Sequence, residues 1–129
     1  MTRINDDNAK AQMRKGILEY CILAILSRED SYAPKIIAYL KKTNLIVVEG
    51  TLYPLLTRLK NAGYLAYRWE ESPQGPPRKV YTLTESGRGY LSFLDEAWDE
   101  LVAQIGLVRR GGDDEWRSIA ADTTDSSDL

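Results

Sequence analysis

Hydrophobic positions in residues 49–65 repeat first at the period of a helix and then at the period of a strand. Read at 100° per residue, the apolar side of the helix gathers Leu52, Leu55, Leu56 and Leu59. The other side carries Tyr53, Pro54, Thr57, Arg58 and Asn61. Gly63 ends the helix, and an alternating strand follows at once. A short helix with an apolar back, a polar front and a hairpin directly after it is typical of a recognition helix that a winged helix presents to DNA.

Two further helices are predicted before this segment. Residues 11–28 form a helical pattern that is apolar nearly all round after Gly16, although the run contains Glu19. A helix of this kind is covered on more than one side, and in so small a chain we expect a second subunit to supply part of the cover. A second helix is expected from Tyr32 to Thr43, with Pro34 in its first turn. Its inner stripe is Ile36, Ile37 and Leu40.

A two-stranded wing is predicted after the recognition-type helix. Leu65, Tyr67 and Trp69 alternate with polar or small residues, which indicates a half-buried strand. Residues 72–77 are expected to form a long, proline-rich irregular turn. Residues 78–83 form the returning strand, with Tyr81 and Leu83 pointing inward. The expected wing therefore carries its cations, Arg78 and Lys79, at the shoulder of the hairpin.

A long helix with a regular apolar seam is predicted at the end of the folded region. Thr84 is its expected cap, and Glu85 suits the positive end of the helix. Its apolar positions are Leu91, Leu94, Trp98, Leu101, Ile105 and Val108. Their steps of 3, 4, 3, 4 and 3 are those of a heptad, which favours pairing with a second helix.

These segments divide the chain into four parts. Residues 1–9 are expected to be a flexible arm, and residues 10–83 a winged-helix DNA-binding domain whose first helix also lies in a dimer interface. Residues 84–110 are the dimerisation helix, and residues 111–129 a disordered acidic tail. The fold class is α+β, mainly α: a winged helix-turn-helix with a long C-terminal dimerisation helix.

The distribution of charge permits nucleic-acid binding although the net charge is −2. Residues 111–129 hold six acidic residues and one arginine, a net charge of −5. The other 110 residues hold 16 basic and 13 acidic residues, a net charge of +3. A mildly basic folded part binds phosphates where its cations cluster.

Enzymatic chemistry finds little support in this sequence. The chain has no histidine, and its single cysteine, Cys21, lies in an apolar run typical of a core. Phosphate-binding and dinucleotide-binding glycine patterns and metal-ligand clusters are also absent, so no catalytic residue, cofactor or metal is predicted. The longest apolar stretch, Ile17 to Leu26, is about half the length of a membrane span. With no signal-peptide pattern at the N-terminus, we expect a cytoplasmic protein that does not use a membrane.

Four segments together resemble the PadR family of bacterial transcriptional regulators. They are the apolar first helix, SYAPKIIAYLK (31–41), GTLYPLLTRLKNAGYL (50–65) and QGPPRKVYTLTESG (74–87). The single long final helix is similar to the short subgroup of the family, which includes multidrug-sensing repressors. The resemblance implies a homodimer that binds a palindromic operator on double-stranded DNA and represses neighbouring genes.

Residues from three elements are the candidates for DNA contact. From the helix that begins near Tyr32 they are Ser31, Tyr32 and Lys35, whose helix N-terminus suits a phosphate. From the recognition-type helix they are Thr51, Tyr53, Pro54, Thr57, Arg58, Lys60 and Asn61, and from the wing they are Gln74, Gly75, Arg78 and Lys79. Arg58 is expected to form a bidentate hydrogen bond with guanine or to bind a phosphate.

The predicted dimer interface comprises the six seam residues together with Ile17 and Leu18. Trp98 lies in this seam, where it is either a large packing residue or a stacking surface for a planar aromatic effector. Asp95 and Asp99 beside it favour a cationic guest, with cation–π attraction from the indole.

Two other functions fit the same pattern. The fold can serve as a protein-interaction or architectural module without operator binding, which the acidic tail favours slightly. Activation rather than repression is not distinguished by the sequence.

Overall fold

The computed structural model describes residues 6–45, 49–111 and 114–122. Its elements, in chain order, are α1 (Asp6–Arg14), α2 (Ile17–Arg28), β1 (Ser31–Tyr32), α3 (Ala33–Lys42), the 3-10 turn η1 (Glu49–Thr51), α4 (Leu52–Asn61), β2 (Leu65–Ser72), β3 (Gly75–Leu83), α5 (Glu85–Arg110) and α6 (Asp114–Asp122). They belong to two compact units, Met1–Leu94 and Asp95–Leu129.

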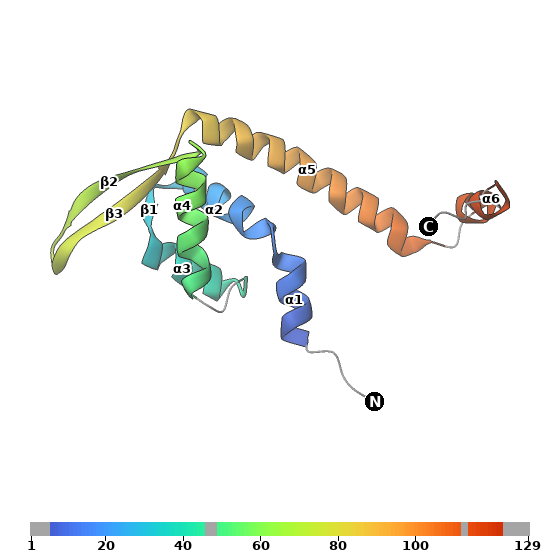
Figure 1. The fold of residues 1–129 in the computed structure, drawn as a ribbon, viewed down its shortest axis with the longest axis horizontal. Coiled ribbons are helices and arrows are strands. Elements are labelled where there is room, and N and C mark those ends of the chain that lie inside the picture. The colour runs from blue at the N-terminus through green and yellow to red at the C-terminus, as the bar shows by residue number, and fades with distance from the viewer. Residues whose placement is uncertain (1–5, 46–48, 112–113, 123–129) are drawn as a thin grey trace. The chain divides into compact units, whose positions relative to one another are not determined.

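The core of the first unit lies where α2, α3 and α4 meet the base of the sheet (Figure 1). Its most buried side chains are Ile22, Leu23, Leu26, Ile36, Leu40, Leu52 and Leu56, each at most 1% exposed. Three of the four leucines predicted for the inner side of α4 are buried, and Leu55 is half-buried at its edge. The stripe predicted for α3 is buried as well, which confirms the helical periods derived from the sequence.

The three strands form one antiparallel sheet in the order β1-β3-β2. β2 and β3 are paired from Leu65–Leu83 at the base to Ser72–Gly75 at the tip, and β1 pairs with Tyr81 and Val80 only. Figure 1 shows the hairpin projecting beyond the helices of the first unit. A mainly helical chain with a small antiparallel sheet and a long helix after it confirms the predicted winged-helix class.

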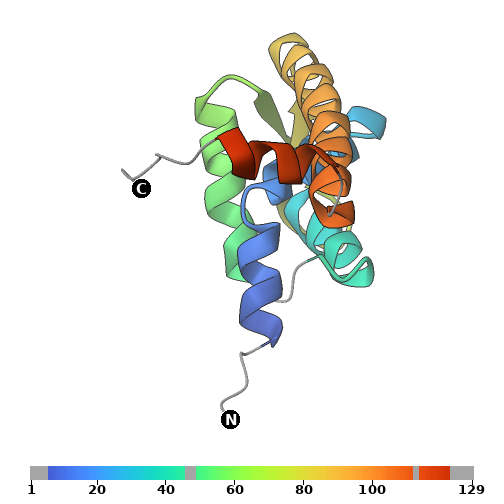
Figure 2. The same ribbon diagram turned by 90° about the vertical axis from the view of Figure 1, so that its right-hand side faces the viewer.

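The N-terminal helix differs from the prediction. One helix was expected over residues 11–28 after a flexible arm, but α1 begins at Asp6 and the helix breaks at Gly16. Gly16 has φ 96°, a left-handed conformation that glycine adopts without steric cost, so the chain turns there and α2 starts in a new direction. Residues 6–9 of the expected arm are therefore helical, and residues 1–5 lie outside the described residues. Figure 1 and Figure 2 show α1 and α2 as separate helices that run in different directions from this break.

The wing also differs from the prediction. Its turn is short, since β3 begins at Gly75 and includes Pro76 and Pro77. Proline fits there because β1 does not reach this end of β3, and because the pairing of β2 with β3 is irregular between Glu70 and Ser72. The prediction of a half-buried first strand was wrong beyond Leu65: Tyr67 is 39% exposed and Trp69 is 63% exposed, because the hairpin extends past the core.

The start of α5 is fixed as predicted by Thr84. Its Oγ1 accepts a hydrogen bond from the Gly87 amide at 2.9 Å and donates one to the Gly63 carbonyl at 2.7 Å. One side chain thus caps α5 and ties it to the turn that follows α4. Gly87 itself is buried against this turn.

The acidic tail differs from the prediction of disorder, since residues 114–122 form α6. Asp114 and Glu115 lie in its first turn, where carboxylates are favoured by the helix dipole. Trp116 and Ile119 are three positions apart and lie on one helix face, a periodicity that the overall polarity of the tail obscured. Residues 112–113 and 123–129 of the expected tail lie outside the described residues.

Candidate nucleic-acid interface

The outward side of α4 is polar and uncharged. Opposite its buried leucines lie Pro54, Thr57 and Asn61, all exposed, and Tyr53 beside them is 48% exposed. Thr57 and Asn61 are one turn apart, so their side chains point the same way. A hydroxyl and a carboxamide at this spacing can hydrogen-bond to base edges or to phosphate oxygens.

The two cations of α4 lie on its flanks. On the side of the wing, the Lys60 ammonium is 5.6 Å from the centre of the Tyr67 ring on β2. On the side of α2, the Arg58 Nε donates a hydrogen bond to Glu19 Oε2 at 2.7 Å. Sequence reasoning did not select Glu19 as a functional residue. The signal that could have found it is its position as the one charged residue in the apolar run from Ile17 to Leu26.

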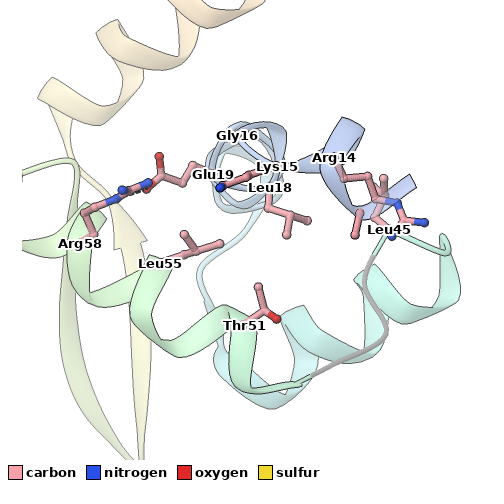
Figure 3. Close-up of a pocket in the computed structure, with 10 residues that line it drawn as sticks. Arg14, Lys15, Gly16, Leu18, Glu19, Leu45, Thr51, Leu55 and Arg58 are labelled. Atoms are coloured by element: carbon pink, nitrogen blue, oxygen red, sulfur yellow. Dashed lines mark hydrogen bonds and ion pairs between the residues drawn. The ribbon is translucent and has the colours of Figure 1, made fainter. Parts of the chain in front are cut away.

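A cleft of about 400 Å³ lies along the Arg58 flank of α4 (Figure 3). Its walls come from α1, α2 and α4, and its lining includes Leu18, Leu55 and Thr51. Thr51 was predicted to contact DNA, but it faces this cleft with Arg58 rather than the outward side with Thr57.

The two wing cations lie against aromatic rings. The Arg78 guanidinium is 4.0 Å from the centre of the Tyr32 ring, and its Nη2 lies 3.9 Å from a Glu70 carboxylate oxygen. The Lys79 ammonium lies on the other face of the wing, 4.3 Å from the Tyr67 ring centre. The faces of these rings attract both cations, so each is held in place on the wing.

The predicted wing-tip residues Gln74 and Gly75 are both exposed, Gln74 in the short turn and Gly75 at the start of β3. They lie beyond the cations along the hairpin. The wing therefore offers two fixed cations at its shoulder and an uncharged tip.

The start of α3 places its three predicted residues in different surroundings. Ser31 is buried at 5% exposure, and its Oγ has no hydrogen-bond partner among the described residues. Tyr32 is half-buried beneath Arg78. Lys35 is exposed and pairs with Glu29 at 2.8 Å, a hydrogen bond that raises the pKa of Lys35 and lowers that of Glu29. Lys35 is therefore the cation of this group that a phosphate can reach.

The apolar seam predicted on α5 is exposed in the single chain from Trp98 onward. Trp98 is 42% exposed, Leu101 49%, Ile105 52% and Val108 79%. Leu91 and Leu94, earlier in the same helix, are half-buried against the core of the first unit, and Ile17 and Leu18 on α2 are also half-buried. Asp95 and Asp99 are exposed beside Trp98.

Other chemistry has little support among the described residues. Burial raises the pKa of the Cys21 thiol and so keeps it neutral, as expected of a core residue. No group of three His, Cys, Asp or Glu side chains in the described ranges is placed to hold a metal ion. Within the same ranges, no helix combines the length and the apolar character needed to cross a membrane.

Comparisons with known proteins agree on one family. The profile of the transcriptional regulator PadR-like family matches residues 22–92. A PadR-like transcription factor from Bacteroides fragilis is 56% identical, with 78% of this chain and 98% of that chain covered and a TM-score of 0.66. A PadR-like transcriptional regulator from Bacillus cereus is 33% identical, with 78% and 99% covered and a TM-score of 0.70.

One solved relative contains DNA. The structure of Bacillus subtilis PadR in complex with operator DNA is 27% identical to this chain, with a TM-score of 0.57. The match covers 61% of this chain and 45% of that chain.

Proposed function

Because this chain belongs to the PadR-like family of transcriptional regulators, we propose that it is a homodimeric repressor that binds a pseudo-palindromic operator. Members of the family regulate transcription and are not enzymes, so the chain is a DNA-binding regulator. To this family role the proposal adds that the protein represses transcription, that it is a homodimer, that an effector releases it from DNA, and which residues contact the DNA. As a regulator of DNA, it is expected to act in the cytoplasm.

The observation that carries the proposal is the polar outward side of α4 with the wing beside it. Thr57 and Asn61 on α4 are assigned to base edges. Tyr53 and Lys60, which are seven positions apart and share one flank of the helix, are assigned to phosphates. The wing cations Arg78 and Lys79 are assigned to flanking phosphates, with Gln74 and Gly75 at the tip, and Lys35 adds a phosphate contact at the start of α3. The operator complex of the Bacillus subtilis relative supports this use of the fold.

The exposed seam of α5 supports the homodimer. Four apolar side chains on one side of the helix are exposed to solvent in the single chain: Trp98, Leu101, Ile105 and Val108. Pairing with a second copy removes this apolar area from water. A twofold dimer presents two copies of α4, so half-sites about 34–36 Å apart, or a multiple of that spacing, are expected.

The proposed effector is a small planar aromatic cation held between the two copies of α5. Trp98 supplies a stacking surface, and Asp95 and Asp99 supply negative charge nearby. To release the operator, the effector must bind the DNA-free dimer more tightly than the bound one. Titration of tryptophan fluorescence with planar cations, with and without operator, tests this in a Trp69→Phe/Trp116→Phe variant that keeps Trp98 alone. Equal affinity in both states would remove Trp98 from the mechanism.

The main experiment compares binding of the purified protein to its own upstream region and to a scrambled duplex of equal length. Fluorescence anisotropy at several salt concentrations gives the affinity and its salt slope. We expect preference for the upstream region and a steep slope, because phosphate contacts release counterions. Lys60→Ala is expected to lower the slope by about 1.8, because the dimer loses one phosphate contact in each subunit, whereas the matched control Lys42→Ala on the far end of α3 leaves it unchanged.

The pairing of interface cations within the chain favours one other function, a protein-interaction module without operator binding. Arg58 and Lys35 both have carboxylate partners at hydrogen-bond distance. Equal, weak binding to both duplexes at low salt would favour this module.

If the protein does prefer its upstream region, a reporter gene fused to that region separates repression from activation. Deletion of the protein raises expression of the reporter in the case of repression and lowers it in the case of activation.

A further inference from the structure

We infer that Glu19 and Arg58 form a clamp that fixes the rotation of α4 about its own axis, and that Arg58 is a positioning residue rather than a DNA contact. The clamp is defined here as this pair alone. Its consequence for DNA rests on the proposed function, whereas its existence within the fold does not.

The geometry of the pair is directional. Arg58 lies on α4 and Glu19 on α2, 39 positions apart in sequence. Two nitrogens of the guanidinium, Nε and Nη2, converge on the same carboxylate oxygen at 2.7 and 2.6 Å (Figure 3). The guanidinium is planar and rigid, so the charge-assisted hydrogen bond from Nε and the ion-pair contact of Nη2 restrict the direction of both side chains.

Burial differs sharply between the two partners. The Glu19 side chain is only 18% exposed, while that of Arg58 is 67% exposed. If Arg58 left for a phosphate, the Glu19 side chain, which is less exposed than its partner, would lose the charge that neutralises it, which is costly. The Lys35–Glu29 pair provides the contrast, since its side chains are 56% and 66% exposed. Both of those groups are solvated when separated, so Lys35 can exchange its partner for a phosphate at little cost.

The place of Arg58 on α4 explains what the clamp does. It lies on the flank toward α2, next to Leu55, which faces Leu18 across the cleft (Figure 3). The buried leucines of α4 hold the helix against the core and prevent large rotations, but small rotations change their non-directional apolar contacts little. The hydrogen bond to Glu19 is directional and opposes these small rotations. Thr57 is the neighbour of Arg58 in sequence, so the clamp also sets the angle at which Thr57 and Asn61 meet the bases.

The test is a pair of single variants and their charge swap, Arg58→Ala, Glu19→Gln and Glu19→Arg/Arg58→Glu. Circular dichroism first establishes which variants are folded, and anisotropy then measures upstream-region affinity and its salt slope. We expect both single variants to weaken binding by a similar factor, about three- to thirty-fold as for other residues that act through a neighbour. Their slopes stay at the wild-type value, and the swap restores most of the affinity. Lys60→Ala, which removes a proposed phosphate contact on the other flank of each subunit, is the control whose slope falls by about 1.8.

Opposite results overturn the inference. If Arg58 contacts a phosphate, Arg58→Ala lowers the slope like the control, Glu19→Gln leaves binding unchanged or tightens it, and the swap binds worse than either single variant. A double-mutant cycle on urea unfolding keeps the clamp testable even without DNA. Coupling between the two positions supports the clamp, and additive effects reject it. If the wild-type protein prefers neither duplex, the proposed function fails while the unfolding cycle still decides for or against the clamp.

Discussion

Substitution of Gly87 by alanine is expected to destabilise the protein although alanine is the better helix former. A Cβ at this position would lie 2.2 Å from the Tyr64 carbonyl oxygen and 2.6 Å from Leu83 Cδ1. Real Cβ contacts essentially never fall below 3.0 Å, so the carbonyl must retreat by at least 0.8 Å. The same carbonyl accepts a hydrogen bond from the Thr84 amide at 3.1 Å. Thr84 and Gly87 both lie at the start of α5, so moving the Tyr64 carbonyl away from position 87 stretches its hydrogen bond from the Thr84 amide.

The net cost follows from these terms. Overpacking against backbone costs about 1–3 kcal/mol, and the weakened hydrogen bond adds about 1 kcal/mol. The higher helix propensity of alanine offsets about 1 kcal/mol of this destabilisation. We therefore expect Gly87→Ala to lower the free energy of unfolding by about 2 kcal/mol and the melting temperature by about 5–10 °C.

Gly89 offers a matched control two positions away on the same helix. A Cβ there has no neighbour within 4 Å, so Gly89→Ala is expected to stabilise the protein by about 0.5–1 kcal/mol. Thermal and urea unfolding of both variants are compared with the wild type at one protein concentration, because the stability of the proposed dimer would depend on concentration. A Gly87→Ala protein as stable as the wild type would refute the reasoning from the close contact.

Three shorter predictions concern the cap of α5, its exposed seam and the ion pair between Asp30 and Arg68. Thr84→Ala removes the hydrogen bond that caps α5 and the one that joins the helix to Gly63, and is expected to cost about 1–2 kcal/mol in urea unfolding, while Thr84→Ser keeps most of the stability. Leu101→Lys places a charge in the exposed seam and is expected to convert the proposed dimer to monomers in sedimentation velocity. The hydrogen bond from Arg68 is the main cause that lowers the pKa of Asp30, so its stabilising effect is present above the ordinary pKa of 3.8 and is lost as the pH falls through the lowered value. Asp30→Asn should therefore weaken the dependence of stability on pH in that acid range, as measured by acid titration of circular dichroism.

Helical periodicity was enough to place the helices of the core. The leucines of α4 and the stripe of α3 are buried because a side chain's direction around a helix follows from its position in sequence alone. Gly16 was noted in the sequence, but a glycine inside a helical pattern leaves two outcomes open, a tolerated residue or a break. The left-handed conformation that decides between them depends on how α1 packs, which no local pattern encodes.

The strands were predicted less well because alternation gives two faces but not what covers them. Tyr67 and Trp69 share the inward face with Leu65, yet the core ends near Leu65 and leaves them exposed. For the same reason, the sequence did not show that Lys79 on the opposite strand would lie among their rings. Burial along a hairpin depends on its length relative to the core, which is a property of the whole fold.

The candidate interface shows the same limit in its charges. Sequence reasoning selected five cations, and it could not see that Arg58, Lys35 and Arg78 lie near carboxylates of their own chain, or that Lys60 and Lys79 lie over aromatic rings. The cost of separating each of the five cations from its partner decides how readily that cation can bind a phosphate of the DNA. An exposed pair such as that of Lys35 separates at little cost, and a cation over a ring can still meet a phosphate with its outer side. A cation that neutralises a shielded carboxylate does not leave it cheaply. The salt slope of operator binding should therefore reflect four of these cations in each subunit and not Arg58. The number of counterions released from the DNA then follows from the partners of each cation within the chain, rather than from the chain's content of lysine and arginine.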